Sequence, residues 1–205
     1  MLTRELLAFV RASLPPAPAR VLEVGAGSGA LARALTEAGY EVTAVDPAAE
    51  PDSIVQQLSL LDVRGSFDAA VAVVSLHHIE PLQESCNHLA TLLAPGSSVV
   101  IDEIDIDRHD DRAVRWWQSQ REALGFDNHE RDAAQILEEL HRHVHSLEKV
   151  SAALAPRFDF GSPVRGPYLH RWELRPGLRE IEVDLIAEGL LPAVGARLIA
   201  TRAAG

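Results

Sequence analysis

Five ionisable side chains of this chain lie beside or inside apolar stretches. At such places a role in binding or catalysis accounts for a charged residue better than a role in keeping the protein soluble. Glu23 interrupts an apolar run, and Asp46 directly follows another. His77 and His78 follow a third such run, and Glu103 lies just after a fourth. Carboxylates accept hydrogen bonds and pair with cations, and histidine exchanges a proton near neutral pH. These residue types predict a site that binds a polar ligand and can move a proton.

A glycine-rich turn follows the first of these apolar runs. Gly25, Gly27 and Gly29 alternate between the apolar run 21–24 and a helical pattern over 30–38. Glycine allows positive φ and lets a ligand approach the backbone without a Cβ in the way. A helix that begins at such a turn presents unpaired N–H groups. In open α/β sheets, this arrangement cradles polar groups of nucleotides.

The elements that must position these side chains alternate between strands and helices. Apolar runs predict strands, the strongest being near-continuous and thus typical of a strand buried on both faces. Right-handed crossovers then give an open parallel sheet with helices on both faces. The strands are predicted at 20–24, 40–45, 54–57, 67–74 and 98–101, and the helices at 3–14, 30–38 and 83–93.

The second half of the chain does not continue the regular alternation of strands and helices. It predicts a helix over 113–124, one long helix over 133–154, irregular strand segments over 158–172, a helix over 178–187 and a final strand over 193–201. The long helix would carry His141, His143 and His145, of which only the first and last share a face. No third ligand lies nearby, so we predict a solvated face and no metal site.

Four motifs in order resemble those of the class I S-adenosylmethionine-dependent methyltransferases of the small-molecule type, with a methyltransferase type 11/12-like domain. Glu23-Val-Gly25-Ala-Gly27-Ser-Gly29 matches the acidic-x-Gly-x-Gly-x-Gly motif, and Asp46 matches the ribose-binding acid. The stretch 67–79, with its Leu-His-His-Ile ending, and the stretch 92–96 match the motifs of the fourth and fifth strands. A dinucleotide-binding fold stays open, because the glycine turn also fits Gly-x-Gly-x-x-Ala.

The resemblance implies a seven-stranded, Rossmann-like, mostly parallel sheet with an antiparallel last strand and a helical lid. It implies a single domain over 1–205, with a core of 20–103 and 156–203 and a lid formed by 104–155 with the helix 3–14. The implied cofactor is S-adenosyl-L-methionine, which leaves as S-adenosyl-L-homocysteine. The residues expected to bind it are Glu23, Gly25, Ala26, Gly27, Gly29, Asp46, Pro47, Asp62, Ser75 and Leu76.

The methyl acceptor is expected to be a small molecule with an O, N or C nucleophile. Strand ends face the crevice in open sheets, so His77, His78 and Glu103 are the candidate catalytic bases. Trp116 and Tyr168 are candidates for the wall of the acceptor site. Two other functions remain open: a catalytically inactive, cofactor-binding partner protein, and a protein methyltransferase.

Composition narrows the possible partners. The formal net charge is −11, whereas a surface that binds nucleic acid needs an excess of lysine and arginine. No apolar run approaches the roughly 20 residues that cross a bilayer, so no membrane partner is expected. The single cysteine, Cys86, cannot form an internal disulfide, which favours a buried thiol and a cytoplasmic protein. Monomer and homodimer both remain open.

Overall fold

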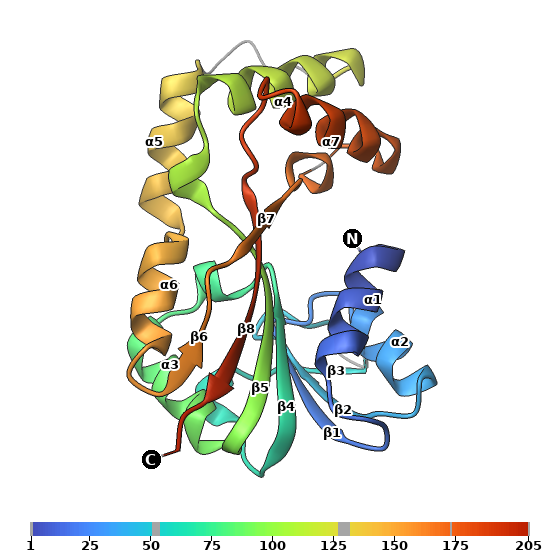
Figure 1. The fold of residues 1–205 in the computed structure, drawn as a ribbon, viewed down its shortest axis with the longest axis vertical. Helices are drawn as coiled ribbons and strands as arrows, with labels where there is room; N and C mark the ends of the chain where they lie inside the picture. Colours follow the sequence, from blue (N-terminus) through green and yellow to red (C-terminus); the bar gives the residue numbers. More distant parts are fainter. Residues whose placement is uncertain (1, 51–53, 127–131, 173, 205) are drawn as a thin grey trace.

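A twisted sheet forms the centre of the computed structural model, which describes residues 2–50, 54–126, 132–172 and 174–204. The strand order is β3-β2-β1-β4-β5-β8-β6, and β7 also pairs with β8 (Figure 1). The strands are β1 (Arg20–Val24), β2 (Glu41–Val45), β3 (Val55–Gln56), β4 (Phe67–Val73), β5 (Leu93–Ile104), β6 (Phe158–Phe160), β7 (Val164–Gly166) and β8 (Gly195–Arg202).

The pairing of the strands confirms the predicted fold class. Strands β3, β2, β1, β4 and β5 are parallel neighbours, and β8 runs antiparallel to β5. Seven strands were predicted, with irregular strand segments over 158–172 before a final strand over 193–201. The final strand is the continuous β8, and the segments before it are the two short strands β6 and β7, which pair one after the other with β8. The sheet of the described residues therefore has eight strands.

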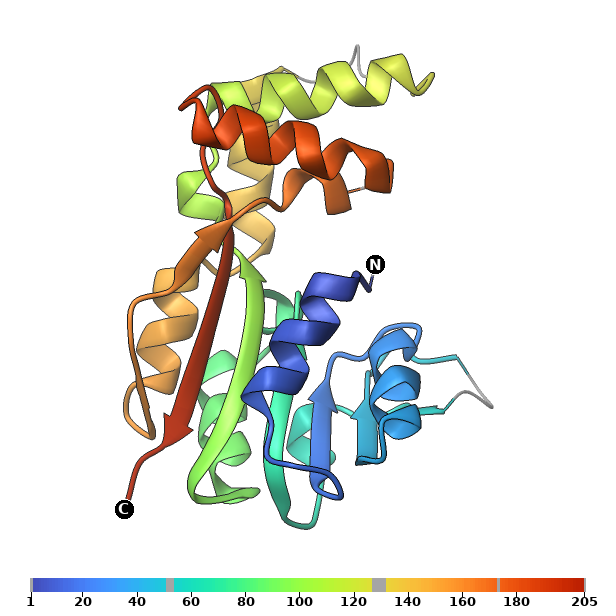
Figure 2. The same ribbon diagram turned by 45° about the vertical axis from the view of Figure 1, so that its right-hand side comes forward.

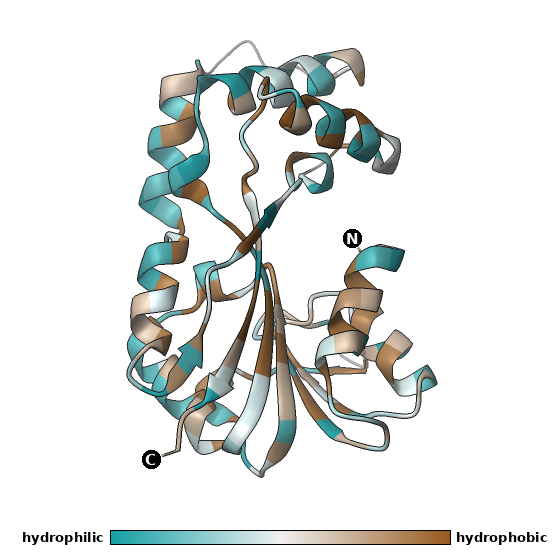
Figure 3. Ribbon diagram, viewed as in Figure 1, coloured by the Kyte–Doolittle hydropathy of each residue, from teal (hydrophilic) through white to brown (hydrophobic). Residues whose placement is uncertain are grey.

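Helices cover both faces of the sheet. Helices α1 (Arg4–Ser13) and α2 (Ala30–Glu37) pack on one face, and α3 (Leu82–Thr91) and α6 (Leu147–Leu154) pack on the other. The central strands contribute buried apolar residues to the cores on both faces of the sheet, and Figure 3 shows brown stretches along these strands. Cys86 lies buried in α3, where burial raises the pKa of its thiol to about 12, so the predicted buried thiol is confirmed.

A second layer of helices lies above the carboxyl ends of the parallel strands. It contains α4 (Asp111–Ala123), α5 (Ala133–His143) and α7 (Arg179–Ala187), and Figure 2 shows α4 and α7 side by side. We call this layer the cap. Because α6 packs on the sheet and α7 lies in the cap, the structure intermixes the ranges predicted as core and lid. The exact division into core and lid stays a prediction.

The single long helix predicted over 133–154 is wrong. Helix α5 ends at His143, Val144 is extended, and α6 begins after Ser146, whose side chain accepts a hydrogen bond from the amide of Lys149. The amide of His145 instead donates to the carbonyl of His77 at 2.8 Å. His141 and His145 therefore do not share a helical face.

Candidate functional site

The glycine turn joins β1 to α2 as predicted. Gly25, Gly27 and Gly29 all have positive φ, at +68°, +52° and +71°. A Cβ at Gly25 would lie 2.3 Å from the Cβ of Ser75, a separation that real Cβ atoms do not show. A Cβ at Gly27 would meet nothing within 4 Å. Gly25 is thus required for packing, whereas Gly27 borders open space.

Asp46 fixes the turn from the end of β2. Its Oδ2 accepts a hydrogen bond from the amide of Gly27 at 2.9 Å, and its Oδ1 accepts one from the amide of Ala48 at 2.8 Å. A carboxylate oxygen has two lone pairs, so each can accept a second donor. The side chain is half-buried and borders the space above the turn.

Glu23 is the most unusual carboxylate of the turn. Its side chain is only 3% exposed, and its Oε2 has no hydrogen-bond partner. Burial raises the pKa of Glu23 to about 7, although the amide of Ala32 and the charge of Arg33 act to lower it. A buried oxygen without a partner is unfavourable in itself, so it marks a place where a donor from a ligand would be stabilising.

These residues border one cavity of about 320 Å³, which we call the turn cavity. Of the predicted cofactor residues, Glu23, Gly25, Ala26, Gly27 and Asp46 line it. The N-terminal segment contributes Leu2, which precedes α1, and Leu6 within α1, and β4 and its following residue contribute Val73 and Val74. The remaining lining residues are Ser28, Ala30 and Leu31.

The other predicted cofactor residues do not line this cavity. Asp62 is exposed in a short helix (η1, Leu60–Asp62), where it accepts a hydrogen bond from the hydroxyl of Ser59 at 2.8 Å. Pro47 is exposed beside Asp46. The placement of Asp62 therefore gives no support to the predicted adenine contact.

Glu103 organises the chain after β4. The side chain is 1% exposed, and its Oε1 accepts hydrogen bonds from the amides of Ser75 and Leu76 at 2.9 and 2.7 Å. Its Oε2 lies 2.6 Å from Nδ1 of His77. The hydroxyl of Ser75 donates to the carbonyl of Val24 at 2.7 Å. Ser75 and Leu76 are thus held between strands, and Glu103 orients His77.

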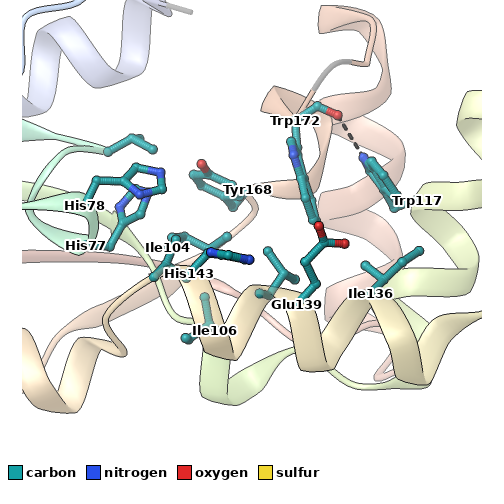
Figure 4. A pocket seen from close by; sticks show the side chains of 13 residues that line it. His77, His78, Ile104, Ile106, Trp117, Ile136, Glu139, His143, Tyr168 and Trp172 are labelled. Carbon is teal, nitrogen blue, oxygen red and sulfur yellow. Dashed lines mark hydrogen bonds between the residues drawn. The ribbon is translucent and has the colours of Figure 1, made fainter. Parts of the chain in front are cut away.

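Above this turn lies a second cavity, of about 470 Å³, between the sheet and the cap (Figure 4). We call it the histidine cavity. His77, His78 and Tyr168 line it as the sequence suggested, but Glu103 does not. Its other lining residues are Val74, Ile104, Ile106, Trp117, Ile136, Glu139, Leu140, His143, Val144 and Trp172.

Aromatic side chains form the far wall of the histidine cavity. The rings of Trp117 and Trp172 stack with centroids 4.4 Å apart, and Nε1 of Trp117 donates to the carbonyl of Trp172 at 2.9 Å. Trp116, the predicted wall residue, packs instead in the apolar core of the cap. Its neighbour on α4 takes the expected place, since adjacent helical residues point about 100° apart.

The two neighbouring histidines differ in their surroundings. His77 is 6% exposed, and its bond to Glu103 leaves Nε2 as the ring nitrogen on the opposite edge of the imidazole. His78 is exposed, and its ring centroid lies 4.2 Å from that of His77. Partial burial lowers the pKa of His78, and the neighbouring His77 lowers it further.

Sequence reasoning missed several lining residues. His143 is exposed, in keeping with the predicted solvated face, but it also lines this cavity, and Ile136 was not singled out. Across the described ranges, no three His, Cys, Asp or Glu side chains are grouped in a way that could hold a metal ion. In the same ranges, no helix is both long and apolar enough to span a membrane.

Val74 connects the two cavities, because it lines both of them. Its φ is +54°, the left-handed region that a β-branched residue rarely adopts. Such strain persists only where surrounding contacts enforce it, and it often occurs at functional sites. The end of β4 is thus the point at which a ligand in the turn cavity would face a ligand in the histidine cavity.

Comparison with known proteins agrees with this architecture. The profile of the methyltransferase domain family matches residues 2–144. A ubiquinone biosynthesis O-methyltransferase from Xanthomonas axonopodis pv. citri is 33% identical over 116 residues, which are 48% of each chain. An uncharacterized methyltransferase from Staphylococcus carnosus is 27% identical over 118 residues, which are 51% of this chain and 57% of the relative. The chain therefore spans about half the length of the curated relatives it matches.

Solved structures share the fold over nearly the whole chain. A Mesorhizobium loti S-adenosylmethionine-dependent methyltransferase aligns with a TM-score of 0.60 and 21% identity, covering 98% of both chains. The Burkholderia thailandensis 1,6-didemethyltoxoflavin-N1-methyltransferase, solved with its acceptor and S-adenosylhomocysteine, aligns with a TM-score of 0.57 and 20% identity, covering 98% of this chain and 78% of that one. With the family profile matching most of the chain, this protein belongs to the methyltransferase domain family, in its class I S-adenosylmethionine-dependent form.

Proposed function

We propose that this chain transfers a methyl group from S-adenosylmethionine to an O, N or C nucleophile of a small molecule held in the histidine cavity. The observation that carries the proposal is the position of Val74, which borders both cavities at the end of β4. A donor in one cavity and an acceptor in the other would meet beside His77. Methyl transfer needs such an in-line approach, and correct positioning can supply several kcal/mol of its acceleration.

The residues of the turn cavity fit the donor. S-adenosylmethionine supplies an electrophilic methyl group on a sulfonium sulfur, together with an ammonium, a carboxylate, a ribose and an adenine. The free Oε2 of Glu23 would accept a hydrogen bond from the ammonium group, directly or through water. Asp46 would accept hydrogen bonds from the ribose hydroxyls while it also accepts those from the amides of Gly27 and Ala48. Gly27 keeps the backbone surface open for close approach, and Gly25 leaves room for Ser75 beside the turn.

His77 fits the role of general base. Its Nδ1 faces the buried carboxylate of Glu103, so the proton on that nitrogen is held in place. The other ring nitrogen would then accept the proton of a hydroxyl group as its oxygen attacks, or the proton of an ammonium group to leave the nucleophilic amine, and Glu103 would stabilise the resulting imidazolium. Glu103 acts through His77 and is a positioning residue. His78, beside it in the cavity, is the alternative base.

The size and lining of the histidine cavity favour a small acceptor. A cavity of about 470 Å³ lies within the range of small-molecule sites, roughly 300–1,000 Å³, and most of its lining is apolar or aromatic. The relatives point in the same direction: one is named for ubiquinone biosynthesis and another for 1,6-didemethyltoxoflavin. Their substrates belong to those proteins, and for this chain they support only the class of acceptor.

Two measurements test the proposal. Calorimetry with S-adenosylhomocysteine should detect one site on the full chain, and a panel of small phenols, amines and carbon acids should include a substrate that His77→Asn no longer turns over. The control variant is His141→Asn, because His141 is exposed on α5, whereas His88 on α3 is half-buried and bonded to the carbonyl of Val63. Cofactor binding without turnover of any small acceptor would favour an inactive partner protein, and turnover of a basic peptide alone would favour a protein methyltransferase.

A further inference from the structure

A third cavity, of about 160 Å³, lies on the face of the sheet that α1 covers. Four arginines line it: Arg165 and Arg197 from β7 and β8, Arg171 after β7, and Arg179 at the start of α7. We call it the arginine cavity. None of the residues that line it lines the turn cavity or the histidine cavity.

The buried acids around this cavity do not balance its arginines. Asp102 is 4% exposed and accepts hydrogen bonds from two arginines. Arg171 donates to its Oδ1, and Arg197 donates to its Oδ2 at 2.7 Å. Arg165 pairs with Asp105, which is 5% exposed. Two buried carboxylates thus face three guanidinium groups.

The fourth arginine pairs only with carboxylates that are open to solvent. Arg179 contacts Glu5 at 2.5 Å and Glu180 at 2.8 Å, and these two acid side chains are 51% and 80% exposed. Exposed pairs are screened by water and stabilise little. Among the described residues that line the cavity, two acids, Glu5 and Asp102, stand beside four arginines, so the lining stays cationic in a chain whose net charge is −11.

We propose that the arginine cavity binds a small anion, a phosphate or a carboxylate group. Guanidinium groups present fixed pairs of N–H donors that match both anions, and each guanidinium has five donors. Each of Arg165, Arg171 and Arg197 directs one nitrogen at a buried carboxylate in the contacts described above. An anion between them would relieve the repulsion of neighbouring positive charges in a partly buried space.

The wall of the arginine cavity is also a wall of the histidine cavity. The short helix η4 (Leu169–Arg171) and its neighbours direct Tyr168 and Trp172 to the histidine cavity, and His170 and Arg171 to the arginine cavity. An anion in the arginine cavity would therefore order the same turn that shapes the acceptor site. The anion could be free, or it could be a group carried by an acceptor that reaches past η4.

Calorimetric titration of the full chain with inorganic phosphate at low ionic strength tests the proposal. We expect one site, and we expect Arg197→Gln to weaken it at least tenfold. Arg115→Gln, on the outer face of α4 with a side chain 73% exposed, is the matched control and should bind phosphate as the unmodified chain does. If Arg197→Gln fails to fold, as judged by circular dichroism, Arg165→Gln replaces it.

Three results would overturn the proposal. The first is that phosphate does not bind, and the second is that Arg197→Gln and Arg115→Gln lower the affinity for phosphate equally. The third is that Arg197→Gln lowers the affinity for S-adenosylhomocysteine as much as that for phosphate, which would assign the arginines to the cofactor. The source of the anion is decided separately, by comparing KM for an uncharged phenol and a phenol that carries a carboxylate. A rise in KM only for the carboxylate in Arg197→Gln assigns the anion to the acceptor, and no change in either assigns it to a free anion.

Discussion

Replacing Glu23 with glutamine should stabilise the ligand-free chain above neutral pH. In the unfolded chain the carboxyl ionises near its ordinary pKa of 4.5, whereas burial raises the folded pKa to about 7. Between pH 4.5 and about pH 7 the carboxyl of Glu23 therefore stays protonated in the folded chain but is ionised in the unfolded chain. The free energy of unfolding falls as pH rises through this window, and the full loss of stability is reached above pH 7. A shift of this size corresponds to about 3 kcal/mol. Glutamine removes the charge but buries an amide, so we expect a net gain of about 1–3 kcal/mol near pH 8.

The same substitution should weaken cofactor binding. If the free Oε2 accepts the ligand's ammonium, the bound carboxyl is ionised and its pKa returns toward the ordinary value. Binding by the unmodified chain must then release a proton at acid pH, so its affinity should fall as pH drops below about 7. Between about pH 8 and about pH 5.5 the expected loss is about 30-fold, or about 2 kcal/mol. Glu23→Gln should bind weakly and show little of this dependence.

Calorimetry with S-adenosylhomocysteine over this pH range, in two buffers of different ionisation enthalpy, measures affinity and proton release together. Urea unfolding of the ligand-free protein measures the stability. Glu37→Gln, an exposed residue on α2, is the control and should change neither quantity. An affinity that is independent of pH in the unmodified chain, or a Glu23→Gln variant with unchanged affinity, would refute the assignment of the buried carboxylate to the ammonium.

Five further substitutions separate the parts of the site. Asp46→Ala removes the acceptor of two backbone amides as well as the proposed ribose contact, so S-adenosylhomocysteine affinity should fall at least tenfold in calorimetry; equal affinity would leave Asp46 as a turn residue only. Gly25→Ala should destabilise the chain by about 2–4 kcal/mol in urea unfolding because of the clash, and Gly27→Ala by about 1–2 kcal/mol because only its φ is strained. His77→Asn should lower kcat roughly 10²–10⁴-fold with cofactor affinity unchanged, and His78→Asn should lower it less; the reverse order would make His78 the base.

The outline of the turn cavity could be predicted because its residues are close in the sequence. The turn from Glu23 to Gly29 and the acid at the end of the next strand are set by strand length, glycine spacing and the parallel register. Those features are local, and each leaves a visible pattern. The other predicted residues, which do not line the cavity, are Gly29, Pro47, Asp62, Ser75 and Leu76. Asp62 is exposed, and its carboxylate has a nearer partner in Ser59.

The acceptor half could not be predicted to the same degree, because it is assembled from distant elements. Whether Trp116 or Trp117 faces the cavity depends on the rotation of α4, which is set by packing in the cap. His143 lines the cavity because it shares a face of α5 with Ile136, Glu139 and Leu140, and α5 ends there, next to the long-range bond from the amide of His145. Apolar periodicity continues across that break and gives no sign of it.

Two turns of the same construction show how the chain fixes its histidines. Glu103 accepts hydrogen bonds from the amides of Ser75 and Leu76 and is bonded to the ring of His77. Glu182 accepts hydrogen bonds from the amides of Tyr168 and Leu169 and is bonded to the ring of His170. The first residues of both turns have nearly the same backbone angles, φ −136° and ψ −35° against φ −146° and ψ −33°. Burial alone would raise the pKa of Glu182, yet the hydrogen bonds from His170 and the backbone amides bring it below its ordinary value.

Each turn has the pattern x-Leu-His, and each glutamate comes from a different element of the fold. The carboxylate satisfies amides that a short helix leaves unpaired, and it fixes which ring nitrogen of the histidine points away. The first turn presents His77 to the histidine cavity, and the second presents His170 to the arginine cavity. Since Tyr168, at the start of the second turn, also lines the histidine cavity, each of the two buried glutamates fixes a residue that lines the proposed acceptor site. Substituting Glu182 should therefore disturb acceptor affinity while leaving the turn cavity intact, whereas substituting Glu103 should also disturb the turn cavity, because Glu103 holds Ser75 against Gly25.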